Sequence, residues 1–98
     1  MPFPPVNFIL VEGIRIAYYE QNPHSEHTIC FIHGNSASSM AWSKQFASPL
    51  LADYRLIAFD LPAHGQSSVS PDPANDYMLK GMGRIMAKAV QAFLPKDN

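Results

Sequence analysis

Residues 28–39 read TICFIHGNSASS, and residues 54–68 read YRLIAFDLPAHGQSS. Each stretch opens with a short run rich in apolar residues, Thr28–Ile32 in the first and Arg55–Phe59 in the second, and each run stops at a polar, turn-forming sequence. Such runs are typical of strands that are covered on both faces, as in parallel sheets. We therefore expect two parallel strands joined by a crossover segment.

The segment between these two runs has helical spacing. Trp42, Phe46 and Leu50 recur every four residues, which predicts a helix from about Ser38 to Leu51 with one apolar stripe. Several serines at its start are candidate N-caps, and Pro49 is expected to end or bend it.

A second helix is predicted close to the end of the sequence. Apolar residues recur there at helical spacing, and they are Met78, Met82, Ile85, Met86, Ala89, Val90 and Phe93. Gly81 and Gly83 each cost about 1 kcal/mol relative to alanine in a helix, so we expect its first turns to be frayed or closely packed.

The amino-terminal part has the pattern of a β-hairpin. Phe8–Val11 and Ile14–Tyr19 are β-rich runs on either side of a Glu-Gly turn. Gln21–His27 and Ser67–Asp76 are polar, contain proline and are expected to be surface loops. The whole order is hairpin, strand, helix, strand, helix, which predicts a single α/β domain with a partly parallel sheet.

Composition excludes several functional classes. The 98 residues are 47% hydrophobic and 15% charged, with a net charge of −1 and no basic run. Binding to nucleic acid or to an anionic membrane is therefore not expected, because both need a cluster of basic residues. The first residues lack the pattern of a secretory signal, and we expect a cytoplasmic protein. A single cysteine, Cys30, is expected to be inert packing, and the four histidines show no metal-ligand spacing. No metal and no cofactor are expected.

The two quoted loops, with a Trp-bearing helix between them, resemble the front part of proteins with the α/β-hydrolase fold. Those proteins have a related hairpin, a His-Gly loop and a D-x-x-G-H-G-x-S-like turn in the same order, and the resemblance extends from about Phe8 to Phe93. It implies an N-terminal part of an α/β-hydrolase sheet, with residues 1–98 forming a partial domain.

The resemblance implies an oxyanion hole in the first loop. The backbone N–H of Asn35 would stabilise a developing oxyanion, and loss of one such donor typically costs about 2.7–4 kcal/mol. Gly34 would permit close approach, and His33 would support the loop. Asn35 could instead be only a turn residue that caps the following helix. Ser36 stands where relatives often have proline.

The second loop is expected to be structural. Asp60 and His64 look like two members of a catalytic triad, but in the family this turn shapes the floor of the site, and its charged members make local hydrogen bonds. Ala63 replaces the more usual glycine.

The family's nucleophile lies in a G-x-S-x-G turn, followed by an acid and a histidine. The closest sequences, Gly34–Ser38 and Gly65–Val69, both lack the closing glycine. We therefore expect that the nucleophile, acid and base are not in this chain and that the chain alone is inactive. Its full-length parent would be a serine hydrolase acting on small-molecule esters, amides or similar bonds.

Two alternatives remain. The parent could be a haloalkane dehalogenase or an epoxide hydrolase with an aspartate nucleophile, and in dehalogenases the asparagine side chain contacts halide. The chain could also be a non-catalytic interaction protein that reuses half of the fold. The missing nucleophile strand would leave the edge of Thr28–Ile32 bare, which predicts self-association through this edge and marginal stability.

Overall fold

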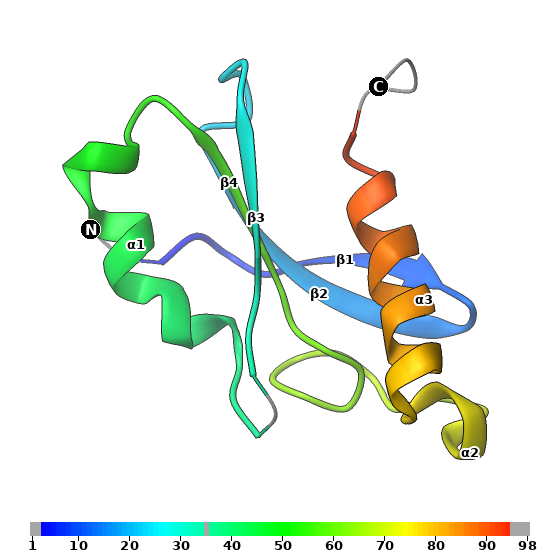
Figure 1. Cartoon of the computed structure of the whole chain (residues 1–98). Helices are drawn as coiled ribbons and strands as arrows, with labels where there is room; N and C mark the ends of the chain where they lie inside the picture. The colour runs from blue at the N-terminus through cyan, green and yellow to red at the C-terminus, as the bar shows by residue number, and fades with distance from the viewer. Residues whose placement is uncertain (1–2, 35, 95–98) are drawn as a thin grey trace.

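The computed structural model describes residues 3–34 and 36–94 (Figure 1). A four-stranded sheet with the order β1-β2-β4-β3 lies at the centre, with α1 on one face and α3 on the other. The expected α/β architecture with a mixed sheet is confirmed.

The sheet begins with the predicted hairpin. β1 (Asn7–Val11) pairs antiparallel with β2 (Ile14–Gln21). Glu12 and Gly13 form the two-residue turn and both have positive φ, 48° and 80°. This is the pattern of a type I′ turn, whose twist matches that of the flanking strands.

The other two strands are parallel to each other. β3 (Thr28–Ile32) pairs with β4 (Arg55–Phe59), and β4 pairs antiparallel with β2. β4 lies between two strands, and its residues from Leu56 to Phe59 are buried as predicted. β3 lies at the edge of the described sheet, and its side chains are only half-buried, with Ile32 44% exposed. Side chains of β3 pack against the cores on both faces, as expected, but the predicted burial is incomplete.

The crossover is not one continuous helix. It consists of η1 (Ser39–Trp42), α1 (Ser43–Ala47) and η2 (Pro49–Leu51). The hydroxyl of Ser48 accepts a hydrogen bond from the N–H of Leu50, and this local contact together with Pro49 separates α1 from η2. Leu50 is consequently 86% exposed, so the predicted stripe is wrong at its third position.

The last part of the chain contains two helices. α2 (Pro73–Asp76) is a single turn inside the segment predicted to be a loop, and α3 (Leu79–Gln91) is the predicted helix. Met78 precedes α3 and is 64% exposed, so it does not belong to the apolar face. The remaining positions of that face are buried or packed against the core.

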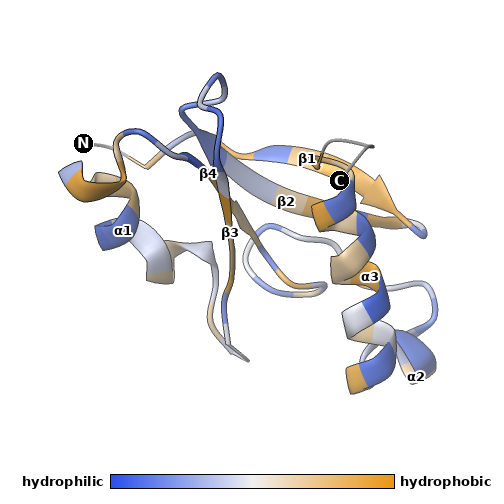
Figure 2. Cartoon of the chain, turned by 45° about the horizontal axis from the view of Figure 1, so that its top comes forward, coloured by the Kyte–Doolittle hydropathy of each residue, from blue (hydrophilic) through white to orange (hydrophobic). Residues whose placement is uncertain are grey.

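Each face of the sheet carries its own hydrophobic core. The core under α3 consists of Val11, Ile14, Ile16, Ile57, Phe59, Leu61, Ile85, Met86 and Ala89. The core under α1 consists of Tyr19, Phe46, Leu56 and Ala58, with Trp42 and Phe31 packed against it. β2 contributes to both cores. Ile14 and Ile16 on one face of the strand are buried, and so are Ala17 and Tyr19 on the other face. Figure 2 shows the hydropathy of each residue along the ribbon, with apolar and polar residues both present along α3.

Within residues 3–34 and 36–94, the helices are all too short or too polar to cross a membrane.

Candidate functional site

The two candidate loops follow the carboxyl ends of neighbouring parallel strands. His33 comes directly after β3, and Asp60 comes directly after β4. The carboxyl ends of parallel strands meet at one edge of a sheet, where functional loops of α/β proteins gather. The strand pairing therefore brings the two loops side by side, as the sequence predicts.

His33 connects the first loop to the second. Its side chain is only 4% exposed. The N–H of Leu61 donates to its Nε2 at 3.0 Å, and its Nδ1 lies 2.6 Å from the carbonyl oxygen of Gly34. Because Nε2 accepts a hydrogen bond, the proton of the neutral ring must be on Nδ1, which donates to Gly34.

His64 makes the reciprocal connection. The N–H of Ser36 donates to its Nε2 at 3.1 Å, and its Nδ1 lies 2.9 Å from the carbonyl oxygen of Pro62. The two imidazole rings lie 5.2 Å apart between their centroids. Each histidine thus binds a backbone N–H of the other's loop. We refer to His33 and His64 as the histidine clasp.

Asp60 lies fully buried beneath the same loops. Its carboxylate accepts hydrogen bonds from the backbone N–H groups of Ser39, at 2.8 Å, and Gln66, at 2.9 Å. The hydroxyl of Tyr19 donates to it at 3.4 Å. Burial, and secondarily the nearby carboxylate, raise the pKa of Tyr19. These donors offset the cost of burying the charge, as buried carboxylates require.

The predicted oxyanion-hole residues are placed only in part. Asn35 lies outside the described residues. Gly34 is exposed, and a Cβ built on it would meet no atom within 4 Å. Ser36 has a φ of 63°, and the N–H of Ala37 donates to the carbonyl of Gly34 at 3.2 Å. Proline has its φ fixed near −65°, so it could not replace Ser36 in this conformation.

The described serines and histidines do not form a catalytic triad. Both ring nitrogens of His33 and of His64 are engaged with backbone groups. The hydroxyl of Ser67 donates to the carbonyl of Asp60 at 2.7 Å and accepts from the N–H of Ala17 at 2.9 Å. Ser67 is therefore a structural link between the second loop and β2.

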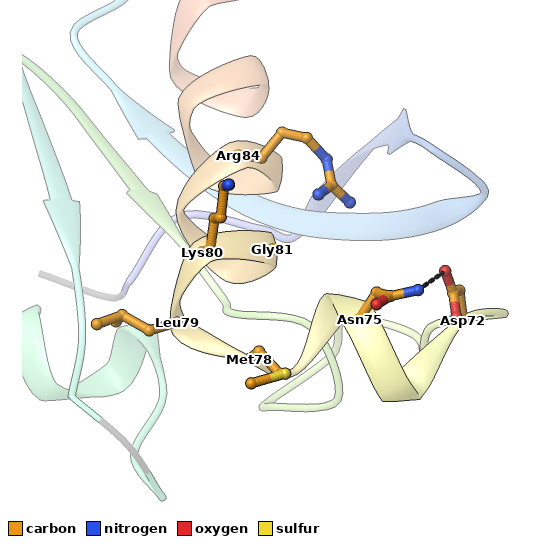
Figure 3. A pocket seen from close by; sticks show the side chains of 7 residues that line it. All are labelled: Asp72, Asn75, Met78, Leu79, Lys80, Gly81 and Arg84. Carbon is orange, nitrogen blue, oxygen red and sulfur yellow. Dashed lines mark hydrogen bonds between the residues drawn. The ribbon is translucent and has the colours of Figure 1, made fainter.

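Two other features lie apart from these loops. The described residues contain no group of three His, Cys, Asp or Glu side chains that could hold a metal ion. A hollow of about 440 Å³ lies at the corner between α2 and α3 (Figure 3), lined by Asp72, Asn75, Met78, Leu79, Lys80, Gly81 and Arg84. None of these residues belongs to the two candidate loops.

A model of the α/β-hydrolase fold matches residues 27–97, which include β3, the crossover, both loops and the helix that follows. The chain belongs to this family. The assignment by resemblance is thereby confirmed, and the match extends over both loops that carry it.

Several of the individual relatives are named as hydrolases. The chain is 41% identical over 69 residues to an uncharacterized hydrolase, YugF, of Bacillus subtilis, covering 67% of this chain and 24% of YugF. A structure of the N-acyl homoserine lactonase AidH with N-butanoyl homoserine is similar with a TM-score of 0.79 and 30% identity, covering 90% of this chain and 32% of AidH. The Cif epoxide hydrolase from Acinetobacter nosocomialis gives a TM-score of 0.77 and 30% identity, covering 90% and 26%.

The chain is much shorter than these relatives. The first curated relatives are matched over 16% to 24% of their own length, and the two structures over 26% to 32%.

Most of the supporting contacts were not predictable from the sequence pattern. Asp60 and His64 were expected to make local hydrogen bonds, and they do so with Gln66 and Pro62. They also contact Ser39 and Ser36, which are more than 20 residues away and were not predicted. The contribution of Tyr19 from β2 has no signal in the sequence, because it depends on where the side chain of a central strand points.

Proposed function

We propose that this chain is the amino-terminal part of an α/β-hydrolase domain and supplies one wall of its oxyanion hole. In the proposed parent, a Ser-His-Asp triad hydrolyses ester, amide or similar bonds of a small molecule. The observation that carries the proposal is the histidine clasp, because it fixes the His-Gly loop at the carboxyl edge of the sheet through backbone contacts on both sides.

The proposed roles follow the order of the first loop. The backbone N–H of Asn35 is the oxyanion donor, Gly34 leaves room for the reacting group, and His33 positions the loop by accepting from Leu61. A fixed N–H dipole stabilises a developing negative charge because it does not have to reorient during the reaction. The loop therefore needs rigid anchoring more than it needs titratable groups.

We propose that the 98-residue chain alone does not catalyse this reaction. The sequence has no G-x-S-x-G turn, and in one of the two closest sequences, Gly65–Val69, the hydroxyl of Ser67 is already bound to the backbone. Purified chain should hydrolyse a p-nitrophenyl ester no faster than a buffer control. Turnover that disappears on changing one of its own serines to alanine would contradict this proposal.

A second candidate parent is an epoxide hydrolase with an aspartate nucleophile. It is favoured by the 30% identity and the TM-score of 0.77 to the Cif epoxide hydrolase. The related proposal of a haloalkane dehalogenase assigns a role to the side chain of Asn35 instead of its backbone N–H.

One experiment distinguishes these roles. We would replace the segment of AidH that aligns with residues 8–93 by these residues and measure hydrolysis of an N-acyl homoserine lactone. If the backbone N–H of Asn35 is the donor, Asn35→Pro should lower kcat about 10²–10³-fold, because proline has no N–H. The matched variant Asn35→Ala keeps the N–H and should retain the activity of the chimera.

Other results would count against the proposal. Equal activity of Asn35→Pro and Asn35→Ala would show that the backbone N–H at position 35 is not the oxyanion donor. Loss of activity in Asn35→Ala would assign the role to the side chain. Circular dichroism of each chimera would establish that the variants are folded.

The third candidate is a non-catalytic interaction protein, and it is favoured by the exposed position of β3 at the edge of the sheet. We propose that the 98-residue chain self-associates through this edge whether or not a parent enzyme exists. The expected cytoplasmic location stays a prediction.

A further inference from the structure

The carbonyl group of Gly34 is held by two hydrogen-bond donors. Its oxygen lies 2.6 Å from His33 Nδ1, which carries the ring proton, and the N–H of Ala37 donates to it at 3.2 Å. A peptide unit is planar and almost always trans, so the N–H of one residue points away from the carbonyl that precedes it. Contacts that fix the Gly34 carbonyl therefore also orient the N–H at position 35, which is the proposed oxyanion donor.

The turn closed by the N–H of Ala37 is strained at its third position. Ser36 has a φ of 63°, and this left-handed conformation costs a residue with a Cβ about 1–2 kcal/mol. Glycine would adopt it freely, but serine does not. A further contact at Ser36 is therefore needed to keep the turn in one conformation.

His64 supplies this contact from the second loop. The N–H of Ser36 donates to its Nε2 at 3.1 Å, and its Nδ1 lies 2.9 Å from the carbonyl oxygen of Pro62. Because Nε2 accepts, the proton of the neutral ring is on Nδ1 and donates to Pro62, which fixes the ring. A hydrogen bond contributes about 0.5–1.5 kcal/mol net, close to the cost of the left-handed conformation of Ser36. The bond to His64 is thus strong enough to decide whether Ser36 keeps that conformation.

The bond between Ser36 and His64 is not needed to satisfy a buried group. Ser36 is exposed, so water could accept from its N–H if the imidazole were absent. The contacts of His33 and Asp60 differ in this respect, because both side chains are buried and need hydrogen-bond partners. What His64 adds is direction, since it selects one orientation of the loop that water would leave open.

We propose that His64 is a positioning residue for the oxyanion donor. By accepting from the N–H of Ser36, it holds the turn that orients the Gly34 carbonyl and, with it, the N–H at position 35. The inference rests on the proposed function and adds the second loop to the oxyanion hole as a support that touches no substrate. It requires a neutral His64 with its proton on Nδ1.

The AidH chimera described above tests this role by kinetics. His64→Leu removes the acceptor and should lower kcat about 10–10²-fold, because a donor displaced by about 1 Å stabilises the transition state poorly. KM should change little, because the oxyanion forms only in the transition state. His64→Gln keeps an acceptor oxygen and should restore most of the lost kcat. The matched control is His24→Leu, which removes an exposed histidine between β2 and β3 and should leave kcat unchanged.

Nuclear magnetic resonance of the 98-residue chain tests the contact itself without any activity. At about pH 8, where the neutral form of histidine predominates, His64 should show the nitrogen signature of the tautomer with the proton on Nδ1. Exchange of the Ser36 amide proton with water should be slow in the parent chain and in His64→Gln, and faster in His64→Leu. If the isolated chain lacks the dispersed amide signals of a folded protein, the same spectra of the chimera decide.

The outcomes separate this inference from the proposed function. If Asn35→Pro lowers kcat and His64→Leu does not, the inference is overturned and the proposed donor stands. An equal loss in His64→Leu and His64→Gln, a change confined to KM, or a ring proton on Nε2 would also overturn the inference. Equal activity of Asn35→Pro and Asn35→Ala would overturn the proposed function and the positioning role with it, even if the Ser36 amide is protected. Loss of kcat in Asn35→Pro and His64→Leu, with recovery in His64→Gln, supports both.

Discussion

The buried carboxylate of Asp60 determines what the neighbouring residues can be. A Cβ on Gly65 would lie 2.3 Å from its Oδ2, and Gly65 has a φ of 49°. Gly65→Ala should therefore destabilise the chain by about 2–5 kcal/mol, from left-handed strain together with overpacking. Ala63, in the same loop, has a φ of 62°, and Ala63→Gly should stabilise by up to about 1 kcal/mol because strain is relieved. Urea unfolding of both variants measures the change in the free energy of unfolding. Changes of the same sign for Gly65→Ala and Ala63→Gly would contradict the prediction.

The sequence predicted the location of these residues better than their contacts. It placed His33 and Asp60 at the ends of parallel strands, and that placement depends only on strand order. It did not predict that His33 and His64 each bind a backbone N–H of the other's loop. That exchange depends on how two loops, 28 residues apart in sequence, orient their side chains. The pattern of residue types contains no information about such an orientation.

At the scale of elements, the two glycines of α3 have opposite surroundings. A Cβ on Gly81 would lie 2.1 Å from the carbonyl oxygen of Asn75 in α2, whereas one on Gly83 would meet nothing within 4 Å. Gly83→Ala should stabilise the helix by about 1 kcal/mol, the difference in helix propensity. Gly81→Ala should destabilise by about 1–3 kcal/mol, because α2 must move to relieve the overlap. Thermal unfolding followed by circular dichroism compares them, and a gain in stability for Gly81→Ala would show that the two helices are not in close contact.

The elements that the sequence predicted correctly are those formed by apolar periodicity. The hairpin, both parallel strands and α3 each have a long enough pattern to outweigh local effects. The crossover failed because serine side chains bind nearby backbone groups and Pro49 interrupts the helix. α2 was missed because four residues are too few to show a helical pattern of apolar residues, although proline at the first helical position is itself a common start signal.

At the scale of the whole molecule, the hairpin turn is joined to α3 by ion pairs. The Oε2 atom of Glu12 lies 3.0 Å from Arg84 Nε and 2.7 Å from Lys88 Nζ. Arg84 also forms an ion pair with Asp76, with 2.8 Å between Nη2 and Oδ1. These contacts connect the first turn of the chain to its last helix, 72 positions further along the sequence. The hydrogen bonds from Arg84 and then Lys88 lower the pKa of Glu12 from 4.5 to about 2.

The lowered pKa of Glu12 predicts how the stability of the molecule depends on pH. A carboxyl whose pKa is lower in the folded state stabilises that state above its ordinary pKa, and this contribution is lost as pH falls through the folded value. Glu12→Gln should therefore be less stable than the parent at neutral pH, and the difference should shrink from about pH 4.5 and vanish near pH 2. Urea unfolding of both proteins at a series of pH values measures the difference between their free energies of unfolding. The titration of carboxyl groups that both proteins share contributes equally to the two values and is removed by the subtraction. Added salt should reduce it at neutral pH, because the pairs are exposed and screened. A difference that is constant from neutral pH to pH 2 would mean that the ion pairs do not connect the hairpin to α3 in solution.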